Sequence, residues 1–516
     1  MGFLINPYLV QPSGPSYDSD AQAFFTAAGI TDTTQKSAVN QLVLDLKSYS
    51  IWTKMTALYP FVGGTSTTHS YNLKNTATFQ LTFNGGGTHA STGWTPNGSN
   101  GYANTGLTPS TSLTQNNSHI SLYNRTNNDG LVVDMGTRDA SYESIMLTRW
   151  SNSTLLNHNT QYGSRMSPSN SDSRGHYIIS RRGATDMEAY KNGSSIATST
   201  ATSGLTTNSI YLSAWNDSGT PSYYANREIA FASIGDGLTD TEAANFYTAV
   251  QAFQTTLSRQ VGVPIVSDSD AQAFLNAAVI TDVTQANAVN QLVTDLKGYS
   301  IWTKMKALYP FVGGTASTHK WNLKNPVDSD AAFRLVFNGG VSHTSSGVAG
   351  NGTNAYYDTK FNPSVQLTSS TGGSAFIYVF NDILDAGVDL AGYQTGVNTR
   401  FQVMSRYAGS FYASMLATNL YSASNSNAIG FYGGTRPAGN TTTFYAVKDA
   451  NSYSYSDSYA NPNCIVMGLA AGVDTTSVSF YTNRGQSFSC MGEGLSTTEA
   501  QNLRTAVLAF NTTLGR

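Results

Sequence analysis

Carboxylates that could carry out acid–base catalysis are scarce in this chain of 516 residues. A glycosidase needs two carboxylates that flank one glycosidic bond, and neither half of the chain places two glutamates on one strand-like stretch. Glu242 and Glu499 each follow a Thr or Ser by three residues, which is the spacing of a helix capping box. The motifs G-x-S-x-G, H-E-x-x-H and C-x-x-C are also absent. We therefore predict that the chain is not an enzyme. Its glutamates are Glu143, Glu188, Glu228, Glu242, Glu493 and Glu499.

Four histidines recur in pairs and are candidate metal ligands. His69 and His319 follow a Gly-Gly-Thr loop, and His89 and His343 follow a Phe-Asn-Gly-Gly segment. No Asp or Cys recurs beside them at ligand spacing, so a structural hydrogen bond is favoured over a metal. Four loop aspartates also lack the spacing of an EF-hand calcium site. We predict neither a metal nor another cofactor, and a calcium site at these aspartates stays an open alternative. These aspartates are Asp134, Asp139, Asp217 and Asp236.

Aromatic residues in polar, turn-rich stretches are candidates for sugar binding. Saccharide sites stack sugar rings on exposed aromatic rings, but a single aromatic residue in such a stretch is more often a packing residue. Trp52 and Trp302, within the repeated helical segment, are expected to be packing residues. The candidates for glycan contact are Trp94, Trp150, Tyr162, Trp215, Tyr223, Tyr224, Phe411, Tyr412 and Tyr421.

The composition excludes several classes of partner. Charged residues make up 11% of the chain and the net charge is −3, without the basic stripe that nucleic-acid binding requires. No apolar run approaches the ~18 residues of a membrane-spanning helix. The first residues lack a charged start and a long apolar core, so they are not a secretion signal. A surface-type composition without an export signal favours release by lysis, as part of a virus particle.

The two cysteines, Cys464 and Cys490, lie in the second half of the chain. The matching positions of the first half carry Ser209 and Ser233, so neither thiol belongs to a repeated framework. We expect small, partly buried residues in strands, and a disulfide between them stays an open alternative.

An internal duplication organises the chain. Asp20–Gly64 returns at Asp270–Gly314 with 36 of 45 positions identical. The ends of the two copies also match, whereas residues 110–220 and 365–475 have diverged. We expect a shared scaffold whose variable middle performs a different task in each copy; loop drift is the alternative.

The repeat defines the domains. Residues 18–260 and 268–516 form two domains, joined by a short linker, 261–267. Residues 1–17 have no counterpart, and three prolines prevent a helix of useful length. They are predicted to form an extended anchoring arm that lies on a neighbouring subunit or on its own domain. Its apolar candidates for anchoring are Phe3, Leu4, Ile5, Tyr8 and Leu9.

Each copy is predicted to begin and end with helices. Val39, Leu42, Val43 and Leu46 share one helical face, and a second short helix is expected over Ile51–Tyr59. Short strands with frequent turns follow, including an Asn-Gly hairpin at position 192. Many short strands without intervening helices indicate a β-sandwich. The predicted fold is mainly β: two tandem sandwiches, each with an N-terminal helical segment and a C-terminal helix.

These motifs resemble known families. The D-A-Q-A-F opening with its I-W-T-K-M segment, the N-G-S-N-G-Y strand and the G-D-G-L-T-D-T-E-A close resemble a module of structural proteins of tailed bacteriophages. The central portion resembles laminin-G-like, concanavalin-type jelly rolls, in which a Leu-Tyr-x-Asn-Gly hairpin matches Ala189–Gly193. The second copy departs from this pattern, because its hairpin carries Asp449-Ala450. The resemblance implies a jelly-roll fold and a place on the outside of a phage particle.

The sequence thus predicts a structural protein displayed on a virion, in the tail fibre or on the capsid, that contacts host surface glycans. Its expected partners are other virion proteins through the arm, host polysaccharide and, as an open option, further copies of itself. Nucleic acid and membrane are not expected partners. Two alternatives remain: a virion-associated polysaccharide depolymerase with a site assembled between subunits, and an assembly protein without a ligand.

Overall fold

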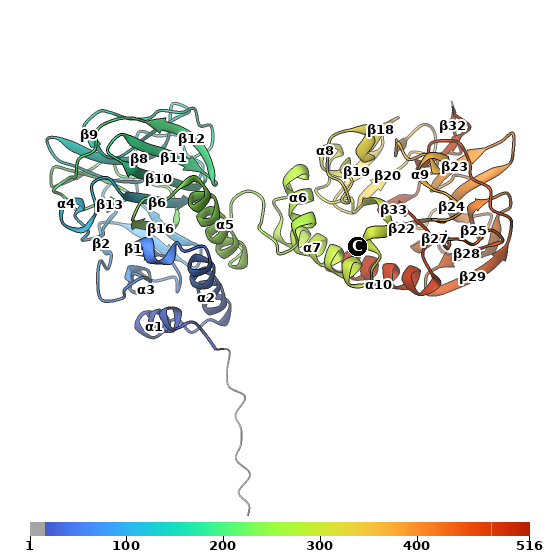
Figure 1. The fold of residues 1–516 in the computed structure, drawn as a ribbon, viewed down its shortest axis with the longest axis horizontal. Helices are drawn as coiled ribbons and strands as arrows, with labels where there is room; N and C mark the ends of the chain where they lie inside the picture. The colour runs from blue at the N-terminus through green and yellow to red at the C-terminus, as the bar shows by residue number, and fades with distance from the viewer. Residues whose placement is uncertain (1–15, 476) are drawn as a thin grey trace, which may run out of the picture. The chain divides into compact units, whose positions relative to one another are not determined.

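The computed structural model describes residues 16–475 and 477–516. The chain divides into two compact units with the boundary between Val261 and Gly262, here called unit 1 and unit 2. Each unit is mainly β with helices at its beginning and end (Figure 1). The predicted fold class is therefore confirmed. The predicted anchoring residues Phe3, Leu4, Ile5, Tyr8 and Leu9 lie outside the described residues.

Unit 1 contains helices, one 3₁₀ turn and two sheets. Its helical elements are α1 (Ser19–Ala28), α2 (Thr33–Ser48), η1 (Trp52–Lys54), α3 (Ser66–Ser70), α4 (Pro109–Ser112) and α5 (Asp240–Thr256). Its strands are β1 (Met55–Tyr59), β2 (Thr82–Asn84), β3 (Gly87–Ala90), β4 (Gly93–Pro96), β5 (Tyr102–Asn104), β6 (Ser118–Asn124), β7 (Met135–Arg138), β8 (Tyr142–Trp150), β9 (Ser153–Gln161), β10 (Gly175–Gly183), β11 (Asp186–Lys191), β12 (Ser194–Ser199), β13 (Tyr211–Leu212), β14 (Trp215–Asp217), β15 (Thr220–Ser222) and β16 (Ile229–Gly235).

Unit 2 repeats this order. Its helical elements are α6 (Ser269–Ala278), α7 (Val283–Gly298), η2 (Trp302–Lys304), α8 (Ala316–His319), η3 (Asp330–Ala332), α9 (Pro363–Gln366) and α10 (Thr497–Thr513). Its strands are β17 (Met305–Tyr309), β18 (Val336–Asn338), β19 (Ser342–Thr344), β20 (Gly347–Ala349), β21 (Tyr356–Asp358), β22 (Gly373–Val379), β23 (Leu390–Gln394), β24 (Thr399–Tyr407), β25 (Ser410–Ala417), β26 (Tyr421–Ser424), β27 (Gly430–Arg436), β28 (Thr443–Lys448), β29 (Asn451–Ser456), β30 (Met467–Gly468), β31 (Ala471–Val473), β32 (Ser477–Ser479) and β33 (Gly485–Gly492).

Two sheets face each other in each unit. In unit 1 the first sheet has the order β12-β11-β10-β6-β16-β4-β3 with β1 added on β16, and the second has the order β15-β14-β7-β13-β5-β2 with β8 and β9 beside β7. In unit 2 the first sheet runs β19-β20-β33-β22-β27-β28-β29 with β17 on β33, and the second runs β18-β21-β30-β23-β24-β25-β26 with β31 and β32 beside β23. Neighbouring strands are antiparallel apart from β14 on β7 and β31 on β23.

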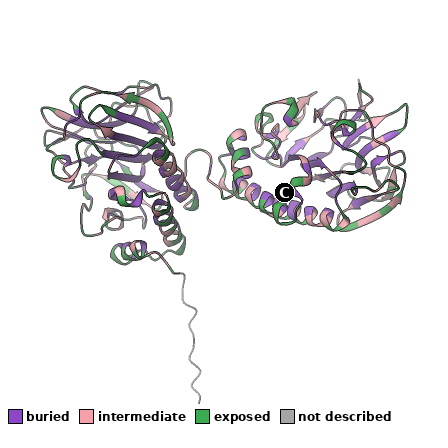
Figure 2. Ribbon diagram, viewed as in Figure 1, coloured by how far each residue is buried: buried purple, intermediate pink, exposed green. Residues whose placement is uncertain are grey.

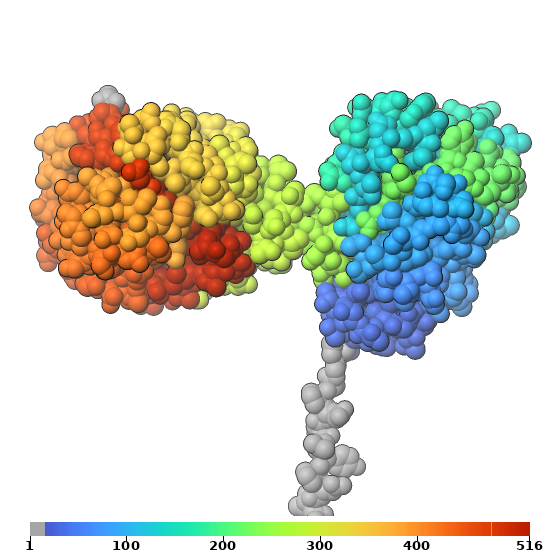
Figure 3. All heavy atoms as spheres, turned by 180° about the vertical axis from the view of Figure 1, so that it is seen from behind, coloured from blue at the N-terminus to red at the C-terminus, as the bar shows by residue number. Residues whose placement is uncertain are grey.

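Each unit has three layers, because the first sheet is apolar on both faces. In unit 1, Ile120 and Leu122 of β6 face the second sheet, whereas Tyr123 faces the helices α1, α2 and α5. Figure 2 shows the strands largely buried and the helices with one buried side. In the space-filling view, the dark-blue opening of unit 1 lies directly against the lighter-blue segment that follows it (Figure 3). The helical stripes therefore dock on the outer face of the first sheet, as amphipathic helices do.

The expected helix over Ile51–Tyr59 is wrong beyond its first turn. Residues Met55–Tyr59 form β1, which pairs with β16. Ala57 faces the core between the sheets while Leu58 faces the helices, and both are fully buried. A strand buried on both faces is a continuous apolar run, which periodicity cannot distinguish from a buried helix.

The hairpin turn at Asn192 is confirmed, and unit 2 keeps its geometry with a different sequence. Asn192 has φ 50° and accepts the backbone N–H of His176 on its Oδ1 atom, at 2.9 Å. In unit 2, Asp449 has φ 48° and accepts the backbone N–H of Phe431 in the same way, at 3.1 Å. Asn and Asp tolerate this left-handed conformation better than other side chains with a Cβ.

Candidate functional site

Two of the aromatic candidates for glycan contact are core residues. Trp94 is 1% exposed and Phe411 is 0% exposed, and both lie between the two sheets of their units. A ring without an exposed face cannot stack on a sugar, so their assignment as glycan contacts is wrong. Both lie in turn-rich sequence, but strands β4 and β25 direct them inward.

Four other candidates line one depression on the second sheet of unit 1. Trp150, Tyr162 and Tyr223 are 40%, 47% and 46% exposed, and Trp215 is 5% exposed. The depression has a volume of about 240 Å³ and is called the unit-1 pocket. Its remaining lining residues are Leu131, Val133, Ile145, Leu147, Leu155 and Arg165.

Strand alternation explains which face carries this pocket. On β8, Met146 belongs to the core between the sheets, whereas its neighbours Ile145 and Leu147 line the pocket. Successive side chains of a strand point to opposite faces. The unit-1 pocket therefore lies on the outer face of the second sheet, away from the helices. Trp150 closes the β8–β9 hairpin opposite Ser153, which holds its ring at the rim.

Two arginines flank the rings of this pocket. Tyr162 and Trp215 are nearly parallel, with ring centroids 6.4 Å apart and 12° between their planes. The guanidinium carbon of Arg138 lies 4.8 Å from the centroid of Tyr162 and 5.0 Å from that of Trp215. For Arg165 the distances are 5.6 and 5.3 Å. Cation–π contacts of this kind fix the orientation of the rings.

Each of these arginines is neutralised by a carboxylate. Glu143 is fully buried and accepts two hydrogen bonds from Arg165, one from Nη2 at 2.6 Å and one from Nε at 2.8 Å. Arg138 donates to Asp217. The Glu143 pairing raises the pKa of Arg165, so this guanidinium stays charged. The four charges sum to zero, and a carboxylate held by two arginine N–H groups is not available as a general acid.

One buried donor in the pocket wall is unsatisfied. Among the described residues, Nε1 of Trp215 has no hydrogen-bond partner although the atom is buried. An unpaired buried N–H is unfavourable in free energy.

The remaining aromatic candidates are not brought into this site. The hydroxyl of Tyr224 donates to the backbone oxygen of Pro221 at 3.0 Å. Tyr421 stacks on Tyr453 at 5.3 Å. Tyr412 packs on a small apolar cluster of the second sheet in unit 2, 5.9 Å from Tyr407.

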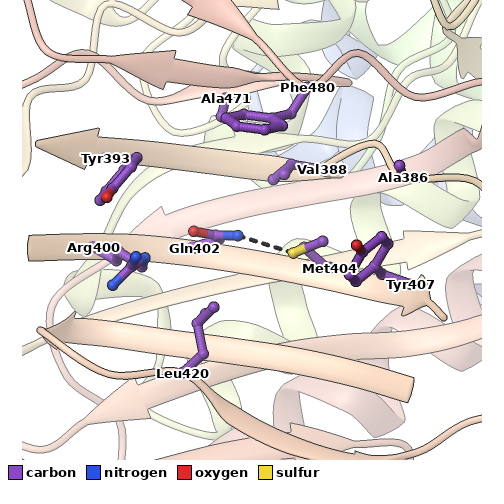
Figure 4. A pocket seen from close by; sticks show the side chains of 10 residues that line it. All are labelled: Ala386, Val388, Tyr393, Arg400, Gln402, Met404, Tyr407, Leu420, Ala471 and Phe480. Atoms are coloured by element: carbon purple, nitrogen blue, oxygen red, sulfur yellow. Dashed lines mark hydrogen bonds between the residues drawn. The ribbon is translucent and has the colours of Figure 1, made fainter. Parts of the chain in front are cut away.

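Unit 2 carries a pocket at the corresponding place, and no residue of it was predicted. This unit-2 pocket has a volume of about 270 Å³ (Figure 4). Tyr407 closes the β24–β25 hairpin opposite Ser410, as Trp150 does opposite Ser153 in unit 1. Its lining residues are Ala386, Val388, Tyr393, Arg400, Gln402, Met404, Tyr407, Leu420, Ala471 and Phe480.

The recurrent histidines form hydrogen-bonded pairs. The Nδ1 atoms of His69 and His89 are 2.9 Å apart, and those of His319 and His343 are 3.0 Å apart. Nε2 of His69 accepts the backbone N–H of Gly64 at 3.2 Å, so its proton resides on Nδ1 and is donated to His89. Burial, with the neighbouring His89 and Arg259 as further causes, lowers the pKa of His69 to about 3. The geometry is that of a structural hydrogen bond joining α3 to the β3–β4 hairpin.

Two of the candidate calcium ligands form ion pairs, and the two cysteines do not form a disulfide. Asp134, like Asp217, pairs with an arginine, here Arg227. Within residues 16–475 and 477–516, no cluster of three or more His, Cys, Asp or Glu side chains could hold a metal ion. Cys464 and Cys490 are buried free thiols. None of the described helices has the length and apolar character needed to span a membrane.

Comparisons with known proteins find partial likenesses of fold. No family model and no curated protein matches the chain. Domain 4 of AbnA, a GH43 extracellular arabinanase from Geobacillus stearothermophilus in complex with arabinotriose, is 15% identical with a TM-score of 0.30, over 38% of this chain and 98% of that one. The CBM40 of a Ruminococcus gnavus IT-sialidase bound to α2,3-sialyllactose is 14% identical with a TM-score of 0.22, over 25% and 82%. Mouse laminin α1 domains LG4-5 are 10% identical with a TM-score of 0.21, over 75% and 83%. None of these likenesses assigns a family or an activity to the chain.

Proposed function

We propose that unit 1 binds a saccharide in the unit-1 pocket. The observation that carries this proposal is the gathering of its exposed hydrophobic side chains. Among residues 16–261, five large hydrophobic side chains are strongly exposed, and four of them, Leu131, Trp150, Tyr162 and Tyr223, line this pocket. Leu44, on α2, is the fifth. A contiguous exposed apolar patch marks a binding site, whereas scattered exposed residues do not.

The chemistry of the pocket favours an uncharged sugar. Aromatic faces suit the C–H side of a pyranose ring, and three such rings, those of Trp150, Tyr162 and Tyr223, are exposed in this pocket. The internally neutralised arginines leave no net charge for an ionic ligand. A polar depression of about 600 Å³ adjoins the pocket across Tyr162, which provides room for a second sugar. The ligand is therefore a neutral oligosaccharide rather than a single ring.

Binding without hydrolysis is part of the proposal. Both oxygens of Glu143 accept hydrogen bonds from Arg165, and Asp217 pairs with Arg138. Two carboxylates free to flank one glycosidic bond are what a hydrolase requires. Incubation of the full chain with the bound glycan should leave its chain length unchanged, and a fall in chain length would favour the depolymerase alternative.

Display on a bacteriophage particle belongs to the same proposal and rests on the sequence resemblance. Gold-labelled antibody against the chain should then decorate intact particles, on the tail or on the capsid. Absence of the chain from purified particles would remove this part of the proposal. Incorporation into particles without retention of any glycan would favour an assembly protein without a ligand.

A glycan array followed by calorimetry tests the binding itself. Trp150→Ala and Tyr223→Ala should each weaken the binding of the retained glycan at least tenfold, because central aromatic contacts dominate binding energy. Leu44→Thr is the matched control, since unit 2 carries Thr294 at this position. Unchanged affinity in both aromatic variants, or an array on which no glycan is retained, would contradict the proposal.

A further inference from the structure

The unit-2 pocket carries a positive charge that the unit-1 pocket lacks. The two pockets correspond residue by residue through the strand pairing. In unit 1, Arg138 of β7 is opposite Asp217 of the parallel strand β14. In unit 2 the same two places hold Tyr393 and Val473. The first ion pair of the unit-1 pocket has thus been replaced by uncharged side chains.

At the second ion pair, the residue that corresponds to Glu143 carries the opposite charge. Glu143 lies seven residues before the hairpin residue Trp150, and Arg400 lies seven residues before the hairpin residue Tyr407. The partner of Glu143 is Arg165. Arg165 precedes Met166, which forms a β-bridge with Leu156 of β9. A buried carboxylate in unit 1 is therefore an arginine in unit 2, and the rim changes from two balanced ion pairs to one cation.

Arg400 is held in place but not neutralised. Its Nη1 donates to the backbone oxygen of Thr418 at 2.5 Å, and its guanidinium carbon lies 4.4 Å from the ring centroid of Tyr393. In the part of the chain that the structure describes, no Asp or Glu oxygen lies within 4.0 Å of its side-chain nitrogens. Figure 4 shows Arg400 and Tyr393 together at one end of the pocket. A partly buried arginine without a counter-ion is poised for an anionic ligand.

A second donor lies beside it on the same strand. Gln402 follows Arg400 by two residues on β24, so both side chains are on one face, with Met404 next in line. Nε2 of Gln402 donates to the sulfur of Met404 at 2.9 Å, while the residue is only 7% exposed. A thioether is a weak acceptor, so this amide gains by turning to a ligand oxygen.

We infer that the unit-2 pocket is a second binding site, selective for a sugar that carries a carboxylate or sulfate group. Arg400 pairs with the anionic group, Gln402 hydrogen-bonds a neighbouring oxygen, and the rings of Tyr393, Tyr407 and Phe480 bound the sugar. The inference depends on the proposed function only in taking the ligand to be a saccharide. One chain then carries two different sugar specificities on the same scaffold.

The test uses the full chain and an array that presents carboxylated, sulfated and matched neutral glycans. Tetragalacturonic acid and its methyl ester are the calorimetric pair, because esterification removes the negative charges and adds only a methyl group to each carboxyl. Arg400→Gln should weaken the binding of retained acidic glycans at least tenfold and leave neutral glycans within twofold. Arg400→Lys, which keeps the charge, should lose less than the Gln variant.

The variants distinguish this inference from the proposed function. Trp150→Ala should have the opposite pattern, with neutral glycans lost and acidic glycans retained. Preference for sulfated over carboxylated glycans identifies the anionic group. Equal binding of a retained acidic glycan and its matched neutral form, unchanged acidic binding in Arg400→Gln, or an array on which no acidic glycan is retained would each overturn the inference, whatever the result for the neutral glycans.

Discussion

The two units preserve one buried ion pair and differ around it. Arg227 contacts Asp134 at 2.8 Å in unit 1, and Arg484 contacts Asp389 at 2.7 Å in unit 2. All four side chains are at most 1% exposed. In both units, the carboxylate also accepts a backbone N–H from the neighbouring strand of the second sheet. The diverged middle of each copy therefore contains a fixed polar framework.

Elsewhere, buried polar residues have been exchanged as sets. In unit 1, His158 lies within 3.0 Å of the hydroxyls of Ser144 and Ser118, and Asn159 donates to Ser118 at 2.9 Å. Removing one member would leave the others unpaired in the core, at a cost of about 1–3 kcal/mol each. Unit 2 has replaced the whole set, so loop drift alone does not explain the divergence. By strand register, the corresponding residues are Met415, Phe401, Gly373 and Leu416.

The exchange leaves unit 1 with three fully buried histidines that unit 2 lacks. His176 is packed among the rings of Phe231 and Phe246, and Phe431 takes its place in unit 2. Burial lowers the pKa of His119 to about 4 and that of His176 to about 3. It also lowers the pKa of His158 well below its usual value, with Arg181 as a second cause. These side chains are neutral in the folded unit.

Acid should therefore destabilise unit 1 more than unit 2, which is the largest effect we expect. Unfolded histidine has a pKa of about 6.5, so stability is complete above that pH and falls as the pH drops toward about 4. At pH 5, His119 and His176 each cost about 2 kcal/mol, and His158 acts in the same direction. His69 and His319 are shifted alike in the two units and cancel. Calorimetry of the full chain at pH 7.5 and pH 5 should show one of two transitions moving sharply down.

His176→Phe, which copies unit 2, assigns that transition. It should recover about 2 kcal/mol at pH 5, or roughly 4–8 °C for a unit of this size. At pH 7.5 the same variant should gain much less, because the unfolded histidine is then mostly neutral. If acid lowered the unfolding temperatures of both transitions equally, the expected difference in acid stability between the two units would be refuted.

Breaking the shared ion pair should destabilise both units by similar amounts. Arg227→Met leaves Asp134 charged and buried, which costs about 3–5 kcal/mol. Arg484→Met should cost about 1 kcal/mol more, because Arg484 also contacts Asp385 at 2.6 Å on the more exposed side. Urea unfolding of each variant measures the loss.

The double substitution Asp134→Leu with Arg227→Met is the control for this loss. Replacing both ions by apolar groups is often near neutral, so it should restore most of the stability. A single-variant loss below about 1 kcal/mol would mean that the pair is solvated in a way that its burial does not indicate.

Elements with one apolar face were predicted correctly from the sequence. An element with two apolar faces was not. The stripe of Val39 and Leu42 is buried as expected, and the side chain of Asp32 caps α2 by accepting the N–H of Gln35 at 2.8 Å. Strand β1 was missed because its residues face two cores.

The site was predicted in part for the same reason. The rings of the unit-1 pocket were named from turn-rich sequence, but Arg138 and Glu143 were not, because their roles depend on partners far along the chain. The unit-2 pocket depends on which residues of β24 face outward. Arg400 and Gln402 line the pocket and alternate with Phe401 and Val403, which are buried in the core. When both faces of a strand are largely buried, its sequence does not show which residues face the core. Sequence alone therefore did not separate the pocket side of β24 from the core side.

The smallest expected effect concerns the hairpin that the two units build with different residues. Asp449→Asn should change stability by less than about 0.5 kcal/mol, because either side chain accepts the partner N–H and tolerates φ near 50°. Asn192→Ala should cost about 1–2 kcal/mol, since it loses that hydrogen bond and keeps an unfavourable backbone conformation. Thermal unfolding of the full chain measures both.

The second residue of the turn gives the sharper contrast. Gly193 has φ 76°, and a Cβ there would lie 3.0 Å from the ring of Tyr247 on α5. Ala450 occupies the matching place in unit 2 and is not among the residues with positive φ. Gly193→Ala should therefore cost at least about 1 kcal/mol through strain and crowding, whereas Ala450→Gly should cost only what a more flexible unfolded chain adds, about 0.4–1 kcal/mol. If Gly193→Ala were instead neutral or stabilising, the turn would be able to adopt the unit-2 geometry, and the helix α5 would not hold it in place.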